Sequence, residues 1–265
     1  MNIPINTPEQ IDKLRIAGRL AASVLEMIEP HIKAGVSTGE LDRICHRYIE
    51  DDIESVSATI GYHGYQHASC ISLNHVVCHG IPDFSKKLKK GDILNIDITI
   101  IKDGYYGDTS AMFIVGENIK GQRLSRVTQE CLYESMKMIR PGVRLSELGR
   151  CIQQHAEANG FSVVRDFCGH GIGTEFHQDP QILHYDGYDA STDAVLEEGM
   201  CFTIEPMINA GDWPTKVLKD GWTAVTRDKS LSAQWEHTLI VSADGVIVTT
   251  KREDEDLSFL GGEYA

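Results

Sequence analysis

Residues 92–115 read DILNIDITIIKDGYYGDTSAMFIV, and this stretch predicts an antiparallel β-hairpin. Up to residue 101 the side chains alternate between apolar and polar, as in a strand that buries one face. The dipeptide Asp103-Gly104 is a strong signal for a tight turn, after which residues 105–115 return as the second strand. The apolar face of the first strand carries Leu94, Ile96, Ile98 and Ile100, and the polar face carries Asn95, Asp97 and Thr99.

The register of this hairpin decides whether two carboxylates meet. A loop made only of the two turn residues places Asp108 opposite Thr99 and Ser110 opposite Asp97. Asp97 and Asp108 are then diagonal neighbours on one face, with Cβ atoms no more than about 7–8 Å apart. Carboxylates that close repel each other unless a proton or a cation lies between them. A bulge would change the register, and two acids that simply face water are the alternative at this point.

Two short patterns recur in the chain at almost the same spacing. The pattern Gly-Val-x-x-x-Glu-Leu-x-Arg begins at Gly35 and again at Gly142, 107 residues later. Gly91-x-x-x-x-Ile96-Asp97 recurs as Gly199-x-x-x-x-Ile204-Glu205, 108 residues later. Chance similarity between helix and strand beginnings is the alternative. The repeat predicts an α+β fold built from two related halves, with the functional site at the seam between them.

Helices are predicted around these strands by capping residues and apolar spacing. Thr7, Pro8 and Gln10 form a helix start with a capping box, and the apolar spacing continues up to Pro30. Ser37 is predicted to begin a second helix, and the ranges 124–139 and 145–159 two more. The acidic run 253–256 is expected to be a solvated end of the chain.

Composition limits the class of protein. The 265 residues include 25 Lys plus Arg against 39 Asp plus Glu, a formal net charge of −14, which disfavours a general nucleic-acid binder. No apolar run approaches the roughly 20 residues of a membrane helix, and the N-terminus lacks a signal pattern. The seven cysteines contain no C-x-x-C pair, as expected for reduced, separate thiols. These features predict a soluble, cytoplasmic, globular protein.

Acids and histidines outside the hairpin extend its polar set. Glu205, the repeat partner of Asp97, follows apolar strand residues, and Glu236 precedes the apolar run 239–241. Acids in such settings are rarely buried without a partner or a metal. His170 lies between glycines that leave room for a ligand, and His177 follows seven residues later. Taken alone, each of these histidines is an ordinary loop residue.

Together these residues form an oxygen-rich donor set of four carboxylates and at least one imidazole. Such a set favours a pair of divalent ions such as Mn, Fe(II) or Co, whereas a structural zinc prefers thiolates or more imidazoles. Two metal ions about 3.5–4 Å apart polarise a carbonyl and activate a water molecule. The residues therefore predict hydrolysis of an amide, an ester or a phosphoester.

Six motifs, taken together, resemble the type I methionine aminopeptidases. They are CHGIP (78–82), NID (95–97), GDT (107–109), GHGIG (169–173), FTIEPM (202–207) and WEHT (235–238). The resemblance extends from the first predicted helix to about residue 250 and is to the short bacterial form. It implies the pita-bread fold, in which helices cover an antiparallel sheet with pseudo-twofold symmetry. It also implies removal of an N-terminal methionine, with a small second residue preferred.

The resemblance implies a metal ligand set residue by residue. Asp97 would hold one divalent ion, Asp108 and Glu236 would bridge two, and His170 and Glu205 would complete the second. Co, Mn, Fe(II), Zn and Ni are all candidates for these ions. A monovalent cation would be bound by backbone carbonyls near Asn74, Val76 and Ser232.

The resemblance also implies catalytic and substrate-binding residues. Glu205 would move a proton, His79 would contact the scissile amide nitrogen, and His177 would stabilise the oxygen of the tetrahedral intermediate. The implied methionine pocket consists of residues that suit a thioether, although each alone is equally an ordinary core residue. These are Tyr62, Tyr65, Cys70, Phe176 and Trp222. The chain departs from the family at Thr59, where many bacterial relatives have cysteine, and at residues 66–69.

The implied substrates are the N-termini of nascent polypeptides. The basic run Lys-Lys-Leu-Lys-Lys at 86–90 is either a solvated turn or a transient contact to ribosomal RNA. We expect a monomer without membrane or specific DNA partners. We also expect one metallopeptidase catalytic domain over 1–265, with halves of roughly 1–117 and 118–250 and a short tail.

Two other functions are considered. A proline-specific pita-bread peptidase usually carries an additional N-terminal domain, for which this chain has no room. A non-catalytic binding module on the same fold loses metal ligands, whereas this chain keeps all five.

Overall fold

The predicted hairpin is present in the computed structural model, which describes residues 2–261. Its strands are β4 (Ile93–Lys102) and β5 (Tyr105–Ile114). Asp97 pairs with Ser110 and Thr99 with Asp108, so the predicted register is confirmed. Asp103 and Gly104 have φ values of 50° and 83°, as a two-residue hairpin turn with two positive φ angles requires.

The first half of the chain builds a sheet around β4 and covers it with two helices. One edge of β4 pairs with β5, and the other pairs with β1 (Val56–Ser57) and β2 (Cys70–Leu73). The helices are α1 (Pro8–Ile28), which has the predicted Thr7 capping box, and α2 (Thr38–Arg47), capped by Ser37. Their apolar sides form one buried core with the apolar face of β4. The structure therefore confirms the capping residues and the apolar face predicted from the sequence.

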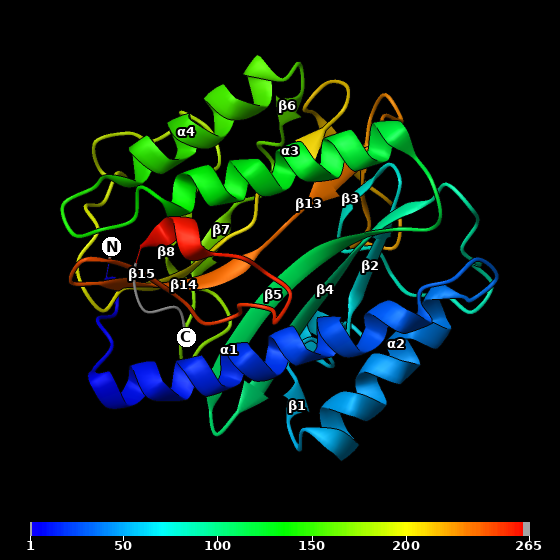
Figure 1. Cartoon of the computed structure of the whole chain (residues 1–265), viewed down its shortest axis with the longest axis horizontal. Helices are drawn as coiled ribbons and strands as arrows, with labels where there is room; N and C mark the ends of the chain where they lie inside the picture. Colours follow the sequence, from blue (N-terminus) through cyan, green and yellow to red (C-terminus); the bar gives the residue numbers. More distant parts are fainter. Residues whose placement is uncertain (1, 262–265) are drawn as a thin grey trace.

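The second half repeats this plan. Its helices are α3 (Ile119–Met136) and α4 (Leu145–Ala158), which lie on a five-stranded sheet and enclose a second core. The strand order is β15-β14-β9-β7-β8. The strands are β7 (Gly169–Gly171), β8 (Gln178–Ile182), β9 (Cys201–Ile204), β14 (His237–Ser242) and β15 (Gly245–Val248). In Figure 1, α1 and α2 lie along the bottom, α3 and α4 along the top, and the large strands between them.

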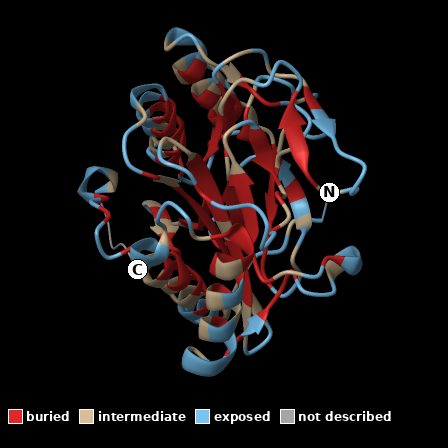
Figure 2. Cartoon of the chain, turned by 90° about the vertical axis from the view of Figure 1, so that its right-hand side faces the viewer, coloured by how far each residue is buried: buried red, intermediate tan, exposed pale blue. Residues whose placement is uncertain are grey.

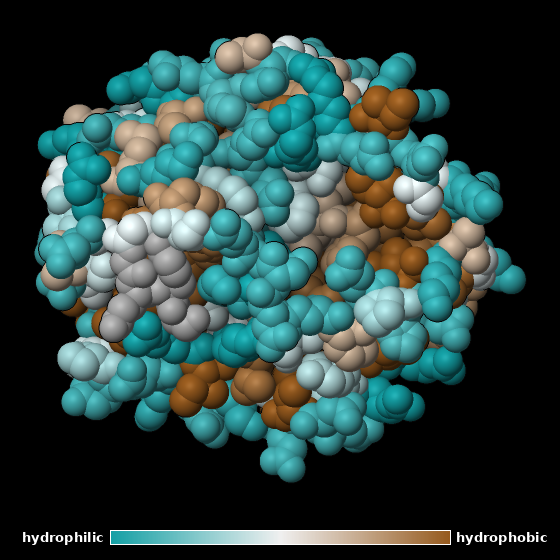
Figure 3. Space-filling model, viewed as in Figure 1, coloured by the Kyte–Doolittle hydropathy of each residue, from teal (hydrophilic) through white to brown (hydrophobic). Residues whose placement is uncertain are grey.

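Two small sheets complete the fold, in the orders β13-β10-β6 and β11-β12-β3. Their strands are β3 (Val76–Cys78), β6 (Ser162–Val163), β10 (Met207–Asn209), β11 (Thr215–Val217), β12 (Ala224–Thr226) and β13 (Ser232–Gln234). Short helical turns lie at Glu29–His31, Tyr48–Asp52, Tyr62–Gly64 and Ser258–Leu260. Burial is concentrated in the strands, while the loops and outer helix faces are exposed (Figure 2). The face that carries the helices is mostly hydrophilic, with scattered apolar areas (Figure 3).

The internal repeat corresponds to matching backbone geometry. Gly35 and Gly142 have φ values of 94° and 93°, and Gly91 and Gly199 have 90° and 88°. The amide of Gly35 donates to the Leu88 carbonyl, and the amide of Gly142 donates to the Leu196 carbonyl. The two leucines are 108 residues apart, close to the spacing of the repeat. The bridge between residues 37 and 87 has its counterpart between residues 144 and 195. Equivalent positions thus have equivalent conformations and partners, as expected for two related halves.

The two halves meet where β5 contacts the segment before β14. Ser110 forms an isolated antiparallel bridge with Glu236, whose amide donates to the Ser110 carbonyl at 3.2 Å. Thr238 donates from Oγ1 to the Asp108 carbonyl at 2.7 Å. This seam places residues of both halves around one space, as the repeat predicted.

Two expectations need correction. Helix α3 begins at Ile119 and ends at Met136, whereas apolar spacing predicted 124–139. Asn118 caps the first turn by accepting a hydrogen bond from the Gly121 amide. Apolar spacing does not predict this turn, because Ile119 is 83% exposed and lies outside the apolar stripe. The acidic run 253–256 is also not wholly solvated, because Glu255 is buried.

No helix within residues 2–261 combines the length and apolar character that crossing a membrane requires. All seven cysteines lie in the described part of the chain, and none of them forms a disulfide.

Candidate metal centre

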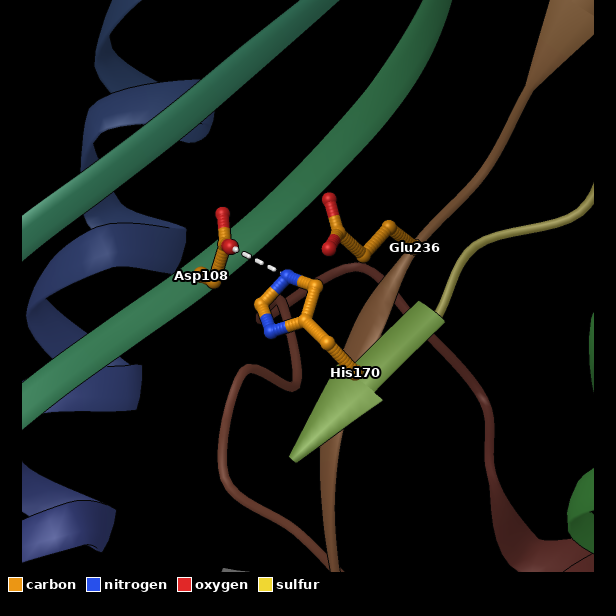
Figure 4. A group of neighbouring side chains, drawn as sticks. All are labelled: Asp108, His170 and Glu236. Carbon is orange, nitrogen blue, oxygen red and sulfur yellow. Dashed lines mark ion pairs between the residues drawn. The ribbon is translucent and has the colours of Figure 1, made fainter. Parts of the chain in front are cut away.

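The five predicted metal ligands line one cavity at the seam, with a volume of about 670 Å³. Asp97 and Asp108 come from the hairpin and His170 from β7, while Glu205 follows β9 and Glu236 precedes β14. Ligand atoms of Asp108, His170 and Glu236 lie within 4.8 Å of one another, and Figure 4 shows their side chains pointing toward a common point. His170 Nε2 lies 3.6 Å from Asp108 Oδ2 and 3.5 Å from Glu205 Oε1.

Crowding of acids raises their proton affinity. Burial and then the neighbouring carboxylates raise the pKa of Asp97 and of Glu236 well above the usual range. Burial raises the pKa of Glu205 to about 7, although His170 opposes this shift. Burial also opposes charging of His170, but its hydrogen bond to Asp108 and the charge of Glu205 raise its pKa overall. The two acids of the hairpin therefore do not face bulk water, which was the alternative interpretation.

This arrangement fits divalent cations. Four carboxylates crowded beside one imidazole repel each other, and positive charge between them removes that repulsion. Oxygen-rich donors with one imidazole are the ligands of Mn, Fe and Co ions, whereas no thiolate takes part in the ligand group found among the described residues. Asp108, His170 and Glu236 already converge closely enough to hold one ion.

Hydrogen bonds from neighbouring residues orient the ligands. Thr99 Oγ1 donates to Asp108 Oδ1 at 2.8 Å, and Thr203 Oγ1 donates to Glu205 Oε1 at 2.9 Å. Gln234 Nε2 donates to the other Glu205 oxygen at 3.2 Å. Ordered partners of this kind fix the direction of a ligand's lone pairs.

His184 holds the backbone of Glu205. It is fully buried, burial lowers its pKa to about 3, and its Nε2 accepts a hydrogen bond from the Glu205 amide at 3.1 Å. The ring is therefore neutral, with its proton on Nδ1. His184 and Gln234 lie 21 and 29 residues from Glu205 in the sequence, so no local pattern predicts their contacts with it. Two signals were available: Thr203 lies two residues before Glu205, and the hairpin register places Thr99 opposite Asp108.

The glycines around His170 have a different role from the predicted one. A Cβ on Gly171 would lie 2.0 Å from the Asp179 carbonyl, and one on Gly169 would lie 2.4 Å from the Thr203 carbonyl. The chain's own backbone, rather than a ligand, approaches these positions. Glycine is needed because β7 is enclosed by its neighbouring strands, which holds His170 in place.

The other predicted site residues line the same cavity, and they form two aromatic groups. Tyr62, Phe176 and His177 contact one another, with ring centroids 4.8 Å apart for the first two and 4.2 Å for the last two. Tyr65 lies edge-on to Trp222 with centroids 5.0 Å apart. The remaining predicted residues in the lining are Cys70 and His79.

The two cavity histidines outside the ligand set are held neutral. Burial lowers the pKa of His79, and burial together with His170 lowers the pKa of His177 to about 4. His177 Nδ1 lies 2.8 Å from the Tyr62 hydroxyl. The cavity also contains residues that the sequence analysis did not select for the site, among them Asp166, Phe167, Cys168 and Met207, together with the divergent Thr59.

Residues 12–243 match the model of metallopeptidase family M24. The chain belongs to this family. The methionine aminopeptidase of Escherichia coli K12 is 59% identical over 258 residues, which cover 97% of each chain. The structure of the methionine aminopeptidase from Rickettsia prowazekii is similar, with a TM-score of 0.91 and 49% identity over 94% of this chain and all of that chain.

The family assignment confirms the predicted pita-bread fold and the divalent metal chemistry of this M24 metallopeptidase. A prolidase from Pyrococcus furiosus shares the fold, with a TM-score of 0.72 at 23% identity. The match covers 94% of this chain but only 66% of the prolidase chain. At this identity the similarity shows a shared fold only. The part of the prolidase outside the match agrees with the expectation that proline-specific relatives have additional residues.

Proposed function

We propose that this M24 metallopeptidase removes the N-terminal methionine from peptides and nascent proteins by hydrolysing the first amide bond. The observation that carries the proposal is full-length similarity to methionine aminopeptidases, combined with five intact donors around one cavity. Asp97, Asp108 and Glu236, with His170 and Glu205, would hold two divalent metal ions, which when bound polarise the amide carbonyl and activate water.

Glu205 is proposed to hold and return the proton of the reaction. Burial raises the pKa of Glu205 to about 7 in the metal-free protein, and this raised proton affinity supports a role in proton transfer. The donors from Thr203 and Gln234 fix one oxygen each, so that a proton is taken up and released at a defined position.

His79 and His177 are proposed to orient the scissile amide. With the Tyr62 hydroxyl as donor to Nδ1, the neutral His177 ring carries its proton on Nε2 and offers it to the oxygen of the tetrahedral intermediate. His79 is neutral and lines the same cavity, and we assign it to the amide nitrogen because the CHGIP motif that contains it resembles that of the family. Neutral rings suit both roles, because each acts as a hydrogen-bond donor or acceptor without adding charge to the metal centre.

The methionine side chain is proposed to occupy the space between the two aromatic groups. One group contains Tyr62 and Phe176 and the other contains Tyr65 and Trp222, and all four line the cavity together with Cys70. Thioethers make favourable contacts with aromatic edges and with sulfur.

We place the reaction in the cytoplasm, on the N-termini of nascent chains with a small second residue, and propose that the protein acts as a monomer. The lysines of the run 86–90 are all exposed, whereas Leu88 is buried, so the run is an anchored loop available for ribosomal RNA. We also retain a monovalent cation near Asn74, Val76 and Ser232, where the buried Ser232 hydroxyl lacks a hydrogen-bond partner within the described residues.

The test compares two peptides. The protein is reconstituted with Mn, Fe(II) or Co and incubated with Met-Ala-Ser or with an X-Pro peptide, beside an Asp108→Ala variant. We expect release of methionine from the first peptide alone, and loss of release in the variant. Preferred cleavage of the X-Pro peptide, or full activity in the variant, would refute the proposal.

A further inference from the structure

Asp42 is a buried acid of α2 that lies outside the metal centre. Its Oδ1 accepts hydrogen bonds from the amide of Ala68 at 3.0 Å, the amide of Ser69 at 2.9 Å and the hydroxyl of Ser69 at 2.7 Å. Its Oδ2 lies 3.2 Å from His67 Nδ1. The Asp42 side chain is 12% exposed. A carboxylate with several donors in such a place holds their backbone strongly, because charge-assisted bonds are about twice as strong as neutral ones.

The residues bound by Asp42 lie in the sequence between Tyr65 and Cys70, two residues that line the cavity and belong to the proposed methionine pocket. The Tyr65 hydroxyl donates to the Ser69 carbonyl at 2.9 Å, so the bonds to Ser69 also fix the Tyr65 ring. Cys70 follows Ser69 directly and pairs with Asp97 across β2 and β4. The wall segment 65–70 therefore has a pocket residue at each end and Asp42 bonded to its middle.

The wall segment is also held by neutral hydrogen bonds, which are weaker than those to the charged Asp42. Thr59 Oγ1 donates to the His67 carbonyl at 2.7 Å, and the Gly61 amide donates to the Tyr65 carbonyl at 2.7 Å. These bonds come from a loop and not from a helix. Asp42 supplies the charged and rigid side of this clamp, since it projects from a helix whose apolar side is packed in the core.

We propose that Asp42 is a positioning residue for the methionine pocket. Its carboxylate holds the wall segment 65–70 against α2, and through Ser69 it sets the places of Tyr65 and Cys70. Asp42 does not line the cavity, so it affects substrate only through these residues. The inference rests on the proposed function, because it concerns the pocket for the first side chain of that substrate.

Positioning of this kind has a kinetic signature that a merely structural acid lacks. Displacing the wall weakens binding of the methionine side chain while the metal ligands and their donors stay in place. KM and the inhibition constant of the product L-methionine should therefore rise more than kcat falls. The inhibition constant is informative because it reports binding without a chemical step.

The experiment uses the full-length, metal-loaded protein with Asp42→Ala, Asp42→Asn and Ser69→Ala. The matched control is Asp193→Ala, which removes another largely buried carboxylate that accepts hydrogen bonds from the amide and hydroxyl of one serine, Ser146, outside the cavity. Metal content and urea unfolding are measured for each variant. For Asp42→Ala we expect KM for Met-Ala-Ser and the inhibition constant to rise roughly tenfold, with kcat within about threefold.

The two conservative variants should raise KM less than Asp42→Ala does. Asp42→Asn keeps an oxygen for the two amides but loses the charge, and Ser69→Ala loses one bond, so both are expected to be intermediate. The control should keep the wild-type KM. Wild-type KM in both Asp42→Asn and Ser69→Ala would overturn the inference, even if Asp42→Ala fails to fold. An equal shift in the control, or loss of kcat alone, would overturn it too. An unmodified protein that releases no methionine contradicts the proposed function and the inference with it.

Discussion

The side chains that define this site are acids in a place where water does not stabilise their charge. Six of the 39 acidic residues of the chain line the cavity at the seam, and four of these are the candidate metal ligands. Burial and mutual repulsion raise the pKa of three of them: Asp97, Glu205 and Glu236. Without cations, such a cluster keeps protons at neutral pH.

The first prediction concerns those protons. A metal ion requires the ionised carboxylates, so metal binding at pH 7 should release protons, and affinity should fall as the pH falls below about 7. Calorimetric titration with Mn(II) in two buffers of different ionisation enthalpy measures the release. The metal-free protein should lose stability as the pH rises through about 7, because the folded state then binds more protons than the unfolded state does. Metal binding without proton release would contradict this account.

The sequence predicts five candidate ligands, which line one cavity in the structure, but not the residues that support them. Asp97 and Asp108 were linked by hairpin register, and Glu205 by the repeat. Thr203 lies only two residues before the acid that it supports, Glu205. Gln234 and His184 act through hydrogen bonds between segments that meet only in the folded chain, and no local pattern marks them. Asp42 was missed for the same reason, since its partners lie more than 20 residues away.

At the scale of elements, local chemistry decided what could be predicted. The two turn residues Asp103 and Gly104 have positive φ, which suits a two-residue loop and fixes the pairing of ten residues in each strand. The start of α3 is marked only by its cap, Asn118, because the exposed Ile119 after it does not continue the apolar stripe. Burial of Glu255 was also not predictable, since an acidic run ordinarily faces water and two of its three partners, Tyr133 and His237, lie on distant elements.

The second prediction concerns this buried acid. Glu255 accepts a hydrogen bond from Arg252 at 2.8 Å, lies 3.0 Å from His237 Nε2, and accepts one from the Tyr133 hydroxyl. Burial opposes its ionisation, but His237 and Arg252 outweigh burial and hold the pKa of Glu255 well below the usual range. Glu255→Gln should therefore lower the free energy of unfolding at pH 7 by roughly 3 kcal/mol.

The pH dependence of this deficit follows from the sign of the shift. A lowered folded-state pKa stabilises above the ordinary value of roughly 4.3, and the contribution is lost as the pH falls toward the folded value. Urea unfolding of both proteins at pH 7 and near pH 4 should show a smaller difference at the lower pH. A deficit that grows on acidification would exclude this role for Glu255.

At the scale of the whole molecule, two similar halves enclose the site from opposite sides. The seam runs through Ser110, which bridges to Glu236, so each half supplies candidate ligands that the other lacks. The repeat predicted this from four glycines and the residues around them. The sequence did not indicate how closely each helix layer approaches its sheet, since that depends on packing across the core.

The third prediction tests that packing beside the site. A Cβ on Gly107 would lie 2.4 Å from the Ala17 carbonyl, so α1 must shift away from β5 next to Asp108. Gly107→Ala should lower the free energy of unfolding by about 1–3 kcal/mol and weaken metal binding. The matched control is Gly245→Ala, where nothing lies nearer than 4.0 Å, and its change should stay within about 1 kcal/mol. Equal losses of stability in the two variants would show that the close approach of the Ala17 carbonyl to Gly107 does not determine stability.

The central claim is that metal ions in this acidic cavity enable the chain to cleave after an N-terminal methionine. Its most direct test is to strip the protein with a chelator, titrate it with Mn(II) and record methionine released from Met-Ala-Ser. The account predicts no release from the stripped protein and a rise in release that saturates as the site fills. Release that persists in the presence of the chelator, or that fails to appear at any metal content, would contradict it.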